Sequence, residues 1–292
     1  MSVAGGTILA AGGFGIGTEK LRSSQNLLVI PGMDISDRDG CTRPHKKLAA
    51  EVKAIAKGHA RDAPVASMCV VAFLLAEVGL LDGRRATTSW MFAADLARRF
   101  PLAWVDVAAM VVEDEGVITT GSFTATFDLA LRLIRQTATA KEARAVERMA
   151  LLNLRASQSP YIDTSMSAAP SGRFSDSVHR WLGENQSKPC DLSLLAAAFH
   201  VSASTMLRRL KVETGQTPLE YLQGERINTA KRLLESGSLS VAQITERVGY
   251  LDFATFSTLF KRLTGQSPAQ YRRSFNVRNV MPAENRLTYN SH

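Results

Sequence analysis

The chain of 292 residues is long enough for two domains, each with its own hydrophobic core. Its hydrophobic fraction of 45% and charged fraction of 21% are those of a globular protein and exclude a disordered or fibrous one. The formal net charge of +8 is concentrated towards the C-terminus, because residues 170–292 contain 16 Lys and Arg against 10 Asp and Glu. This favours a polyanionic partner such as nucleic acid, with an incidental charge imbalance as the alternative.

The three cysteines, Cys41, Cys69 and Cys190, are odd in number and are not spaced like zinc ligands. They predict neither a disulfide framework nor a metal site, and no cofactor is expected. The longest uncharged apolar run, 65–76, is shorter than the ~20 residues of a membrane span, and no signal peptide is recognisable. The chain is therefore expected to be soluble and cytoplasmic, with no membrane partner.

The first half of the chain alternates short β-branched runs with helical patterns, which predicts an α/β layer architecture. Strands are expected at 26–32, 64–69, 86–89, 104–107 and 117–119. Helices are expected at 43–59, 70–78 and 127–134, and Gly79 is expected to end the second of them. Between 156 and 173 the pattern dissolves into Ser, Pro, Ala and Gly, which is typical of a linker.

Everything after this linker is predicted to be helical and contains an internal repeat. The sequence LKVETGQTP at 210–218 recurs as FKRLTGQSP at 260–268. A short apolar helix, a turn and a basic helix precede each copy, at 192–199 and 202–212 and again at 241–248 and 252–263. A helix pair of this kind projects the polar face of its second helix, a geometry that enters a DNA major groove.

Residues at the ends of the second helices support this interpretation. Ser202 and Asp252 are placed to accept backbone N–H groups as N-caps. A glycine follows each of these helices and is expected to end it, at Gly215 and Gly265. A proline three residues later is expected to open the next helix, at Pro218 and Pro268.

The region from 174 to 276 resembles the DNA-binding domain of the AraC/XylS family of transcription regulators. The family joins two helix-turn-helix units by a long helix, matched here by 221–235, and its most distinctive stretch is matched by VGYLDFATFSTLFKR at 248–262, followed by TGQSP and Tyr271-Arg272. The resemblance implies an all-α C-terminal domain that binds double-stranded DNA, a homodimer, and contact with RNA polymerase. Activation is the expected direction of regulation, with repression left open, and 277–292 is expected to be a C-terminal tail.

This resemblance places residues of both recognition helices against the bases: Ser204, Leu207 and Arg208 in the first, and Ala254, Thr255, Ser257 and Thr258 in the second. Arg208 has the strongest chemical argument, because a guanidinium bonds O6 and N7 of guanine together. A further group is expected to contact phosphates, with a solvated surface position as the alternative: Lys211, Lys261, Arg262, Arg272 and Arg273. Four apolar residues at i, i+4 spacing are expected in the core: Met206, Leu210, Phe256 and Phe260.

The junction ASMCVVAFLLAEVGLLDGRRATTSW at 66–90 resembles the nucleophile elbow of the ThiJ/PfpI and glutamine-amidotransferase-like domains. A subgroup of AraC-type regulators carries this flavodoxin-like α/β domain at the N-terminus, here at 1–155. A cysteine between a strand end and a helix N-terminus is expected to have a lowered thiol pKa, so Cys69 taken alone suggests an enzyme.

Three departures from this family argue against catalysis. Val71 stands where the elbow usually has glycine, and Ser89 stands where the subgroup usually has histidine. Only a short glycine-rich stretch precedes the first strand, so the domain looks N-terminally abbreviated. The other candidate bases, His45 and His59, lie in a basic helical stretch and are expected at the surface.

The chain is therefore interpreted as a sequence-specific DNA-binding transcriptional regulator and not an enzyme. Its N-terminal domain is expected to supply dimerisation and to bind a small-molecule effector in a pocket that includes Cys69, Ser89 and Trp90. The alternative is a Cys-dependent amidase- or protease-like enzyme with an appended DNA-binding module.

Overall fold

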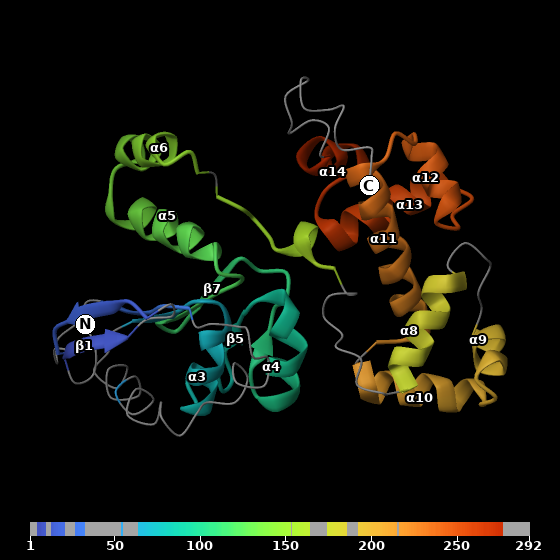
Figure 1. Cartoon of the computed structure of the whole chain (residues 1–292), viewed down its shortest axis with the longest axis horizontal. Helices are drawn as coiled ribbons and strands as arrows, with labels where there is room; N and C mark the ends of the chain where they lie inside the picture. The colour runs from blue at the N-terminus through green and yellow to red at the C-terminus, as the bar shows by residue number, and fades with distance from the viewer. Residues whose placement is uncertain are drawn as a thin grey trace. The chain divides into compact units, whose positions relative to one another are not determined.

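The computed structural model describes residues 5–9, 13–20, 27–32, 54, 64–152, 154–163, 174–185, 192–214 and 216–276 (Figure 1). The chain divides into two compact units, unit 1 (Met1–Gln158) and unit 2 (Ser159–His292). Several expected features lie outside the described residues: the helix at 43–59 with both of its histidines, Cys41, Cys190, Gly215 and the tail at 277–292.

The centre of unit 1 is a four-stranded sheet in the order β3-β4-β8-β7. Its parallel strands are β3 (Leu28–Ile30), β4 (Val65–Ser67) and β8 (Val117–Thr120). The fourth strand, β7 (Val111–Asp114), is antiparallel to β8. Two further pairs complete the strands: parallel β5 (Arg85–Ala86) and β6 (Trp104–Val105), and antiparallel β1 (Gly6–Leu9) and β2 (Gly15–Thr18).

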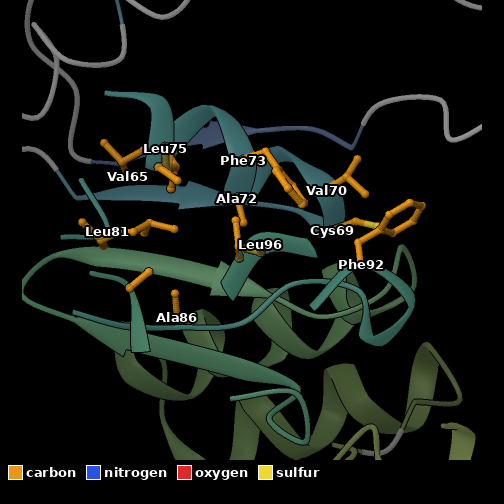
Figure 2. Close-up of a cluster of buried hydrophobic side chains, with 13 residues drawn as sticks. Val65, Cys69, Val70, Ala72, Phe73, Leu75, Leu81, Ala86, Phe92 and Leu96 are labelled. Carbon is orange, nitrogen blue, oxygen red and sulfur yellow. The ribbon is translucent and has the colours of Figure 1, made fainter. Parts of the chain in front are cut away.

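Helices pack on both faces of this sheet, because successive side chains of each strand point to opposite faces. They are η2 (Cys69–Val71), α3 (Ala72–Glu77), η3 (Trp90–Phe92), α4 (Ala93–Arg99), α5 (Ala125–Thr137) and α6 (Ala140–Met149). Val65 and Val117 face a cluster built with α3 and α4, which Figure 2 shows, whereas Ala66 and Ile118 contact Leu129 of α5. The predicted α/β architecture is confirmed.

β8 matches the strand predicted at 117–119, whereas the strands predicted at 26–32, 64–69, 86–89 and 104–107 are present but shorter than expected. Gly79 ends the helix after Cys69 with a φ of +74°, as predicted. The sequence did not predict β7, because its hairpin with β8 turns at Glu115 and Gly116, both with positive φ. A glutamate is an uncommon first residue for such a turn, so the usual Asn-Gly or Asp-Gly signal is missing.

Unit 2 is helical, as predicted. Its elements are η4 (Ser159–Tyr161), α8 (Phe174–Asn185), α9 (Leu192–Ala198), α10 (Ala203–Thr214), α11 (Pro218–Ser236), α12 (Val241–Arg247), α13 (Phe253–Thr264) and α14 (Pro268–Phe275). Each helix pair has its own core: Met206 and Leu210 lie in the first, and Phe256 and Phe260 in the second, all fully buried as expected. No helix among the described residues is long and apolar enough to cross a membrane.

The helix ends follow the predicted caps. The Ser202 hydroxyl accepts the Thr205 N–H at 3.2 Å, and the Asp252 carboxylate accepts the Thr255 N–H at 2.7 Å. These bonds start α10 and α13 at fixed positions. Gly265 ends α13 with a φ of +76°, and Pro218 and Pro268 occupy the first turns of α11 and α14.

The segment expected to be a linker, 156–173, is partly built into the two units. Residues through Gln158 belong to unit 1, where the Gln158 side chain is buried, and residues 159–163 belong to unit 2. The Ser- and Pro-rich composition typical of linkers is therefore misleading over 156–163. Polar groups of Ser157, Gln158 and Ile162 have hydrogen-bond partners in other parts of the chain, and composition does not reveal such partners.

Candidate functional site

The two second helices, α10 and α13, each bury an apolar face and expose the residues expected to face DNA. In α10 the predicted residues Ser204, Leu207, Arg208 and Lys211 are all exposed. In α13 the predicted residues Ala254, Thr255, Thr258, Lys261 and Arg262 are exposed, and Ser257 is half-buried. The predicted recognition residues therefore lie on one accessible face of each helix, opposite the cores.

Short side chains dominate the start of α13. The Thr255 hydroxyl donates to the Asp252 carboxylate at 2.7 Å, so it belongs to the N-cap of α13. The pKa of the Asp252 carboxyl is lowered, mainly by the bonds from the Thr255 hydroxyl and N–H. In α10, by contrast, Arg208 offers a long, exposed guanidinium. The two helices thus present different chemistry to a base edge.

Basic residues of both recognition helices lie near the first turn of α11. The pKa of the Glu220 carboxyl is lowered mainly by hydrogen bonds from Thr217, and the charges of Lys211 and Arg262 lower it further. Lys211 and Arg262 therefore both lie within electrostatic reach of one α11 residue. Lys and Arg in these last turns also suit the negative ends of their helices.

Two residues of α11, Gln223 and Arg226, join this basic region. The Arg262 guanidinium donates to Gln223 Oε1 at 3.4 Å, and the Arg226 guanidinium lies 5.2 Å from the Tyr250 ring centroid. No DNA contact was expected from either residue. Their i, i+3 spacing on one helix face was the available signal.

Two other predicted contact residues have partners within unit 2. Arg272 is half-buried and donates to the Leu239 carbonyl at 2.6 Å, so it holds the segment before α12 where a phosphate contact was expected. Leu207 lines an apolar groove of about 250 Å³ together with Leu192, Leu195, Thr217, Pro218, Leu219 and Leu222. Arg273 is exposed.

In unit 1, the chain turns sharply at Cys69, between β4 and η2. Its φ of +55° is uncommon for a residue other than glycine, so Cys69 itself makes the turn for which a glycine at the position of Val71 was expected. Cys69 is 5% exposed and belongs to the apolar cluster that Figure 2 shows. The Thr88 hydroxyl donates to its carbonyl at 2.8 Å, which supports the turn.

The expected lowering of the thiol pKa is wrong. Burial raises the pKa of Cys69, and polar groups of Val70 and Ser89 that face the sulfur lower it only in part. Burial therefore favours the neutral thiol over the thiolate. The structure brings the Ser89 side chain to the Cys69 sulfur, and half-buried Trp90 follows Ser89 at the start of η3.

An unpartnered hydroxyl group lies near this turn. Ser67 Oγ is buried and has no hydrogen-bond partner among the described residues, whereas the Ser89 side chain faces the Cys69 sulfur. A buried hydroxyl without a partner is costly, so a polar group of a bound molecule would gain from meeting it. Ser67 ends β4 at the carboxyl edge of the parallel strands, where α/β folds bind ligands.

Each unit is similar to a known protein family. The helix-turn-helix domain family matches residues 195–274, and the DJ-1/PfpI family matches residues 18–136. The MmsAB operon regulatory protein of Pseudomonas aeruginosa is 36% identical over 97 residues, which are 33% of this chain and only 32% of that protein.

Two relatives align with both units. The HTH-type transcriptional regulator GlxA of Rhizobium meliloti is 26% identical over 92% of this chain and 82% of its own length. The HTH-type transcriptional regulator CdhR of Pseudomonas aeruginosa is 27% identical over 93% of this chain and 80% of its own length. The chain therefore resembles regulators that join a DJ-1/PfpI domain to an AraC-type helix-turn-helix domain.

Proposed function

We propose that this chain is a sequence-specific transcriptional regulator that binds double-stranded DNA through α10 and α13. The observation that carries the proposal is the pair of equivalent helices, each capped at its start, buried on one face and basic in its last turn. Relatives that align with both units are named transcriptional regulators, which supports it. Such a regulator acts in the cytoplasm, and RNA polymerase is its proposed partner.

We assign unit 1 the roles of dimerisation and effector binding without catalysis. The raised pKa of Cys69 and the serine at position 89 argue against a Cys-dependent hydrolase. The buried unpartnered hydroxyl of Ser67 favours binding of a small polar molecule beside Cys69, Ser89 and Trp90. The positive φ of Cys69 is the feature that favours the enzyme alternative, because strained backbone often marks active sites.

Replacing Arg208 is expected to flatten base preference in one half of the operator. A bidentate contact to guanine is worth ~1–3 kcal/mol of discrimination, which corresponds to about 5- to 150-fold between bases. Lys261→Ala should instead weaken binding to all sequences alike and reduce the log–log salt slope by about one. Affinities of both variants for a panel of single-base operator variants measure the difference.

Arg209→Ala is the matched control for this experiment. Arg209 neighbours Arg208 in α10, but its guanidinium lies 3.9 Å from the Phe174 ring centroid and is held against unit 2. Its removal should leave base preference unchanged. If Arg208→Ala keeps the wild-type preference at every position, the first recognition helix does not read bases through this residue.

Cys69→Ser is expected to leave DNA affinity unchanged within about twofold, since the thiol contributes to a turn and its apolar surroundings. The same variant distinguishes effector binding without catalysis from the alternative of a Cys-dependent enzyme. Wild-type and Cys69→Ser proteins are incubated with amide and peptide substrates, and no difference in hydrolysis is expected. Hydrolysis by wild type that disappears in the variant would restore the enzyme interpretation.

A further inference from the structure

The turn between α12 and α13 leaves two large apolar side chains at the surface. Leu251 is fully exposed and Phe253 is 52% exposed, and they stand on either side of the Asp252 N-cap. A single exposed apolar residue is common on a protein surface and needs no explanation. Two of them where a recognition helix begins form an apolar patch, and Leu251 and Phe253 are given that name below.

Contacts on both sides fix the backbone that carries the apolar patch. The Tyr250 N–H donates to the Thr245 carbonyl at 3.0 Å, and the Tyr250 ring packs on Phe256 with 5.7 Å between centroids. The Asp252 carboxylate accepts the Thr255 N–H at 2.7 Å. The apolar patch therefore cannot turn into the core without breaking the cap of α13, so its exposure is a consequence of the turn.

Phe253 lies on the same stripe of α13 as two residues that are expected to contact DNA. Phe253, Ser257 and Lys261 recur every four residues, so their side chains lie one above another along the helix. Recognition helices contact base edges mainly through their N-terminal residues. Phe253 is the first residue of α13 and is therefore placed at the end of the helix that enters the major groove.

The internal repeat shows that the apolar patch is particular to α13. At the offset of 50 residues, Val201 and Ala203 stand where the second helix pair has Leu251 and Phe253. Both are smaller and half-buried, so the start of α10 offers no comparable apolar surface. The fold of a helix pair therefore does not require large apolar residues at these positions, which favours a binding role for them in α13.

The chemistry of the major groove identifies what an apolar patch would meet there. The C5-methyl of thymine is the apolar group that base edges present in this groove, and phenylalanine is one of the side chains that contact it. Hydrogen bonding by α13 is limited, since the Thr255 hydroxyl is held in the N-cap and Ser257 is half-buried.

We propose that the apolar patch recognises thymine methyl groups in the half of the operator that α13 contacts. The inference rests on the proposed function and deepens it, because it names the feature of the bases that the second recognition helix reads. Reading by α13 would then depend on burial of methyl groups, whereas reading by Arg208 of α10 would depend on hydrogen bonds.

Replacing thymine by deoxyuracil tests this proposal without changing the protein. The replacement removes the C5-methyl and leaves the hydrogen-bonding groups of the base in place. Each thymine of an operator enriched from genomic fragments by the full chain is replaced in turn, and the dissociation constant is measured. At one or two positions in the half that α13 contacts, binding should weaken about fourfold, the effect of one lost buried methyl-sized group.

Phe253→Ala should remove this response to uracil. The variant is expected to bind the thymine operator at least about fourfold more weakly, and uracil at the same position should then weaken binding no further, because the methyl has already lost its contact. Leu251→Ala should reduce the uracil response in the same half. Leu263→Ala is the matched control, since it truncates an exposed leucine near the other end of α13 and should keep the full response.

Wild-type binding that ignores uracil at every position would overturn thymine recognition by the apolar patch. Effects of Phe253→Ala and uracil that multiply would also overturn it, because the ring and the methyl would then act independently. If Phe253 instead inserts between base pairs, Phe253→Ala would reduce DNA bending, measured by energy transfer between end labels, with no uracil response, and the proposal would be refuted. Equal wild-type affinity for the enriched and a scrambled duplex would refute the proposed function itself.

Discussion

Raising the salt concentration from about 50 to 200 mM is expected to weaken DNA binding about 150-fold, the effect of neutralising four phosphates at a log–log slope of about −0.9 each. Four exposed basic side chains are candidates for these contacts: Lys211, Lys261, Arg262 and Arg273. Lys211 and Arg262 both lie within electrostatic reach of Glu220, so the two helices carry their charge into one region. Titrations of one operator fragment at four salt concentrations give the slope.

A variant that lacks one basic side chain tests whether the salt slope reports the number of phosphate contacts. Lys261→Ala should reduce its magnitude by about 0.9, since one fewer counterion is released. Arg209→Ala is the control, because stacking on Phe174 holds that guanidinium against the protein. An affinity that does not respond to salt would be incompatible with phosphate contacts by these residues.

Phe260→Ala is expected to destabilise the second helix pair by about 3–5 kcal/mol, through lost burial and the cavity that remains. Phe260 is fully buried, and its ring contacts Phe256 and Tyr271 with centroid distances of 5.6 and 5.4 Å. The first helix pair has a separate core around Met206 and Leu210. Protection of the operator from nuclease should therefore be lost in the half that α13 contacts.

The control for this substitution lies in the same helix. Leu263 is 37% exposed, so Leu263→Ala removes apolar atoms without opening a buried cavity and should cost less than ~1 kcal/mol. Urea denaturation followed by circular dichroism compares the two variants. Equal destabilisation by both substitutions would mean that Phe260 is not the centre of this core.

Features set by local residues could be predicted from the sequence. The caps at Ser202 and Asp252, the repeated Gly and Pro, and the apolar spacing of Met206, Leu210, Phe256 and Phe260 all act within a few residues of each other. They therefore gave α10 and α13 to within two residues. The exposed positions of Arg208 and Lys261 followed from the same periodicity.

Features set by distant residues could not be predicted in this way. Gln158 is buried by partners 36 to 71 positions away, and Lys231 meets Ser159 across 72 positions. Composition alone gave this segment the pattern of a linker. Arg272 is similar, since its carbonyl partner Leu239 is 33 positions away.

The thiol of Cys69 illustrates a competition that the sequence does not resolve. Its position at the start of η2 favours a lowered pKa, but burial in the apolar cluster acts in the opposite direction and prevails. The degree of burial depends on how α3, α4 and η3 pack around the turn. The sequence indicated the elbow, but the chemistry of its sulfur follows from packing.

The central claim, sequence-specific DNA binding, is tested most directly by comparing two affinities. Genomic fragments retained by the full chain are sequenced, and the dissociation constant for the enriched site is measured at about 150 mM salt beside that of a scrambled duplex of equal length. We expect the enriched site to be bound more tightly by a factor of at least ~10³, the lower range for specific DNA-binding proteins. A ratio close to one would contradict it.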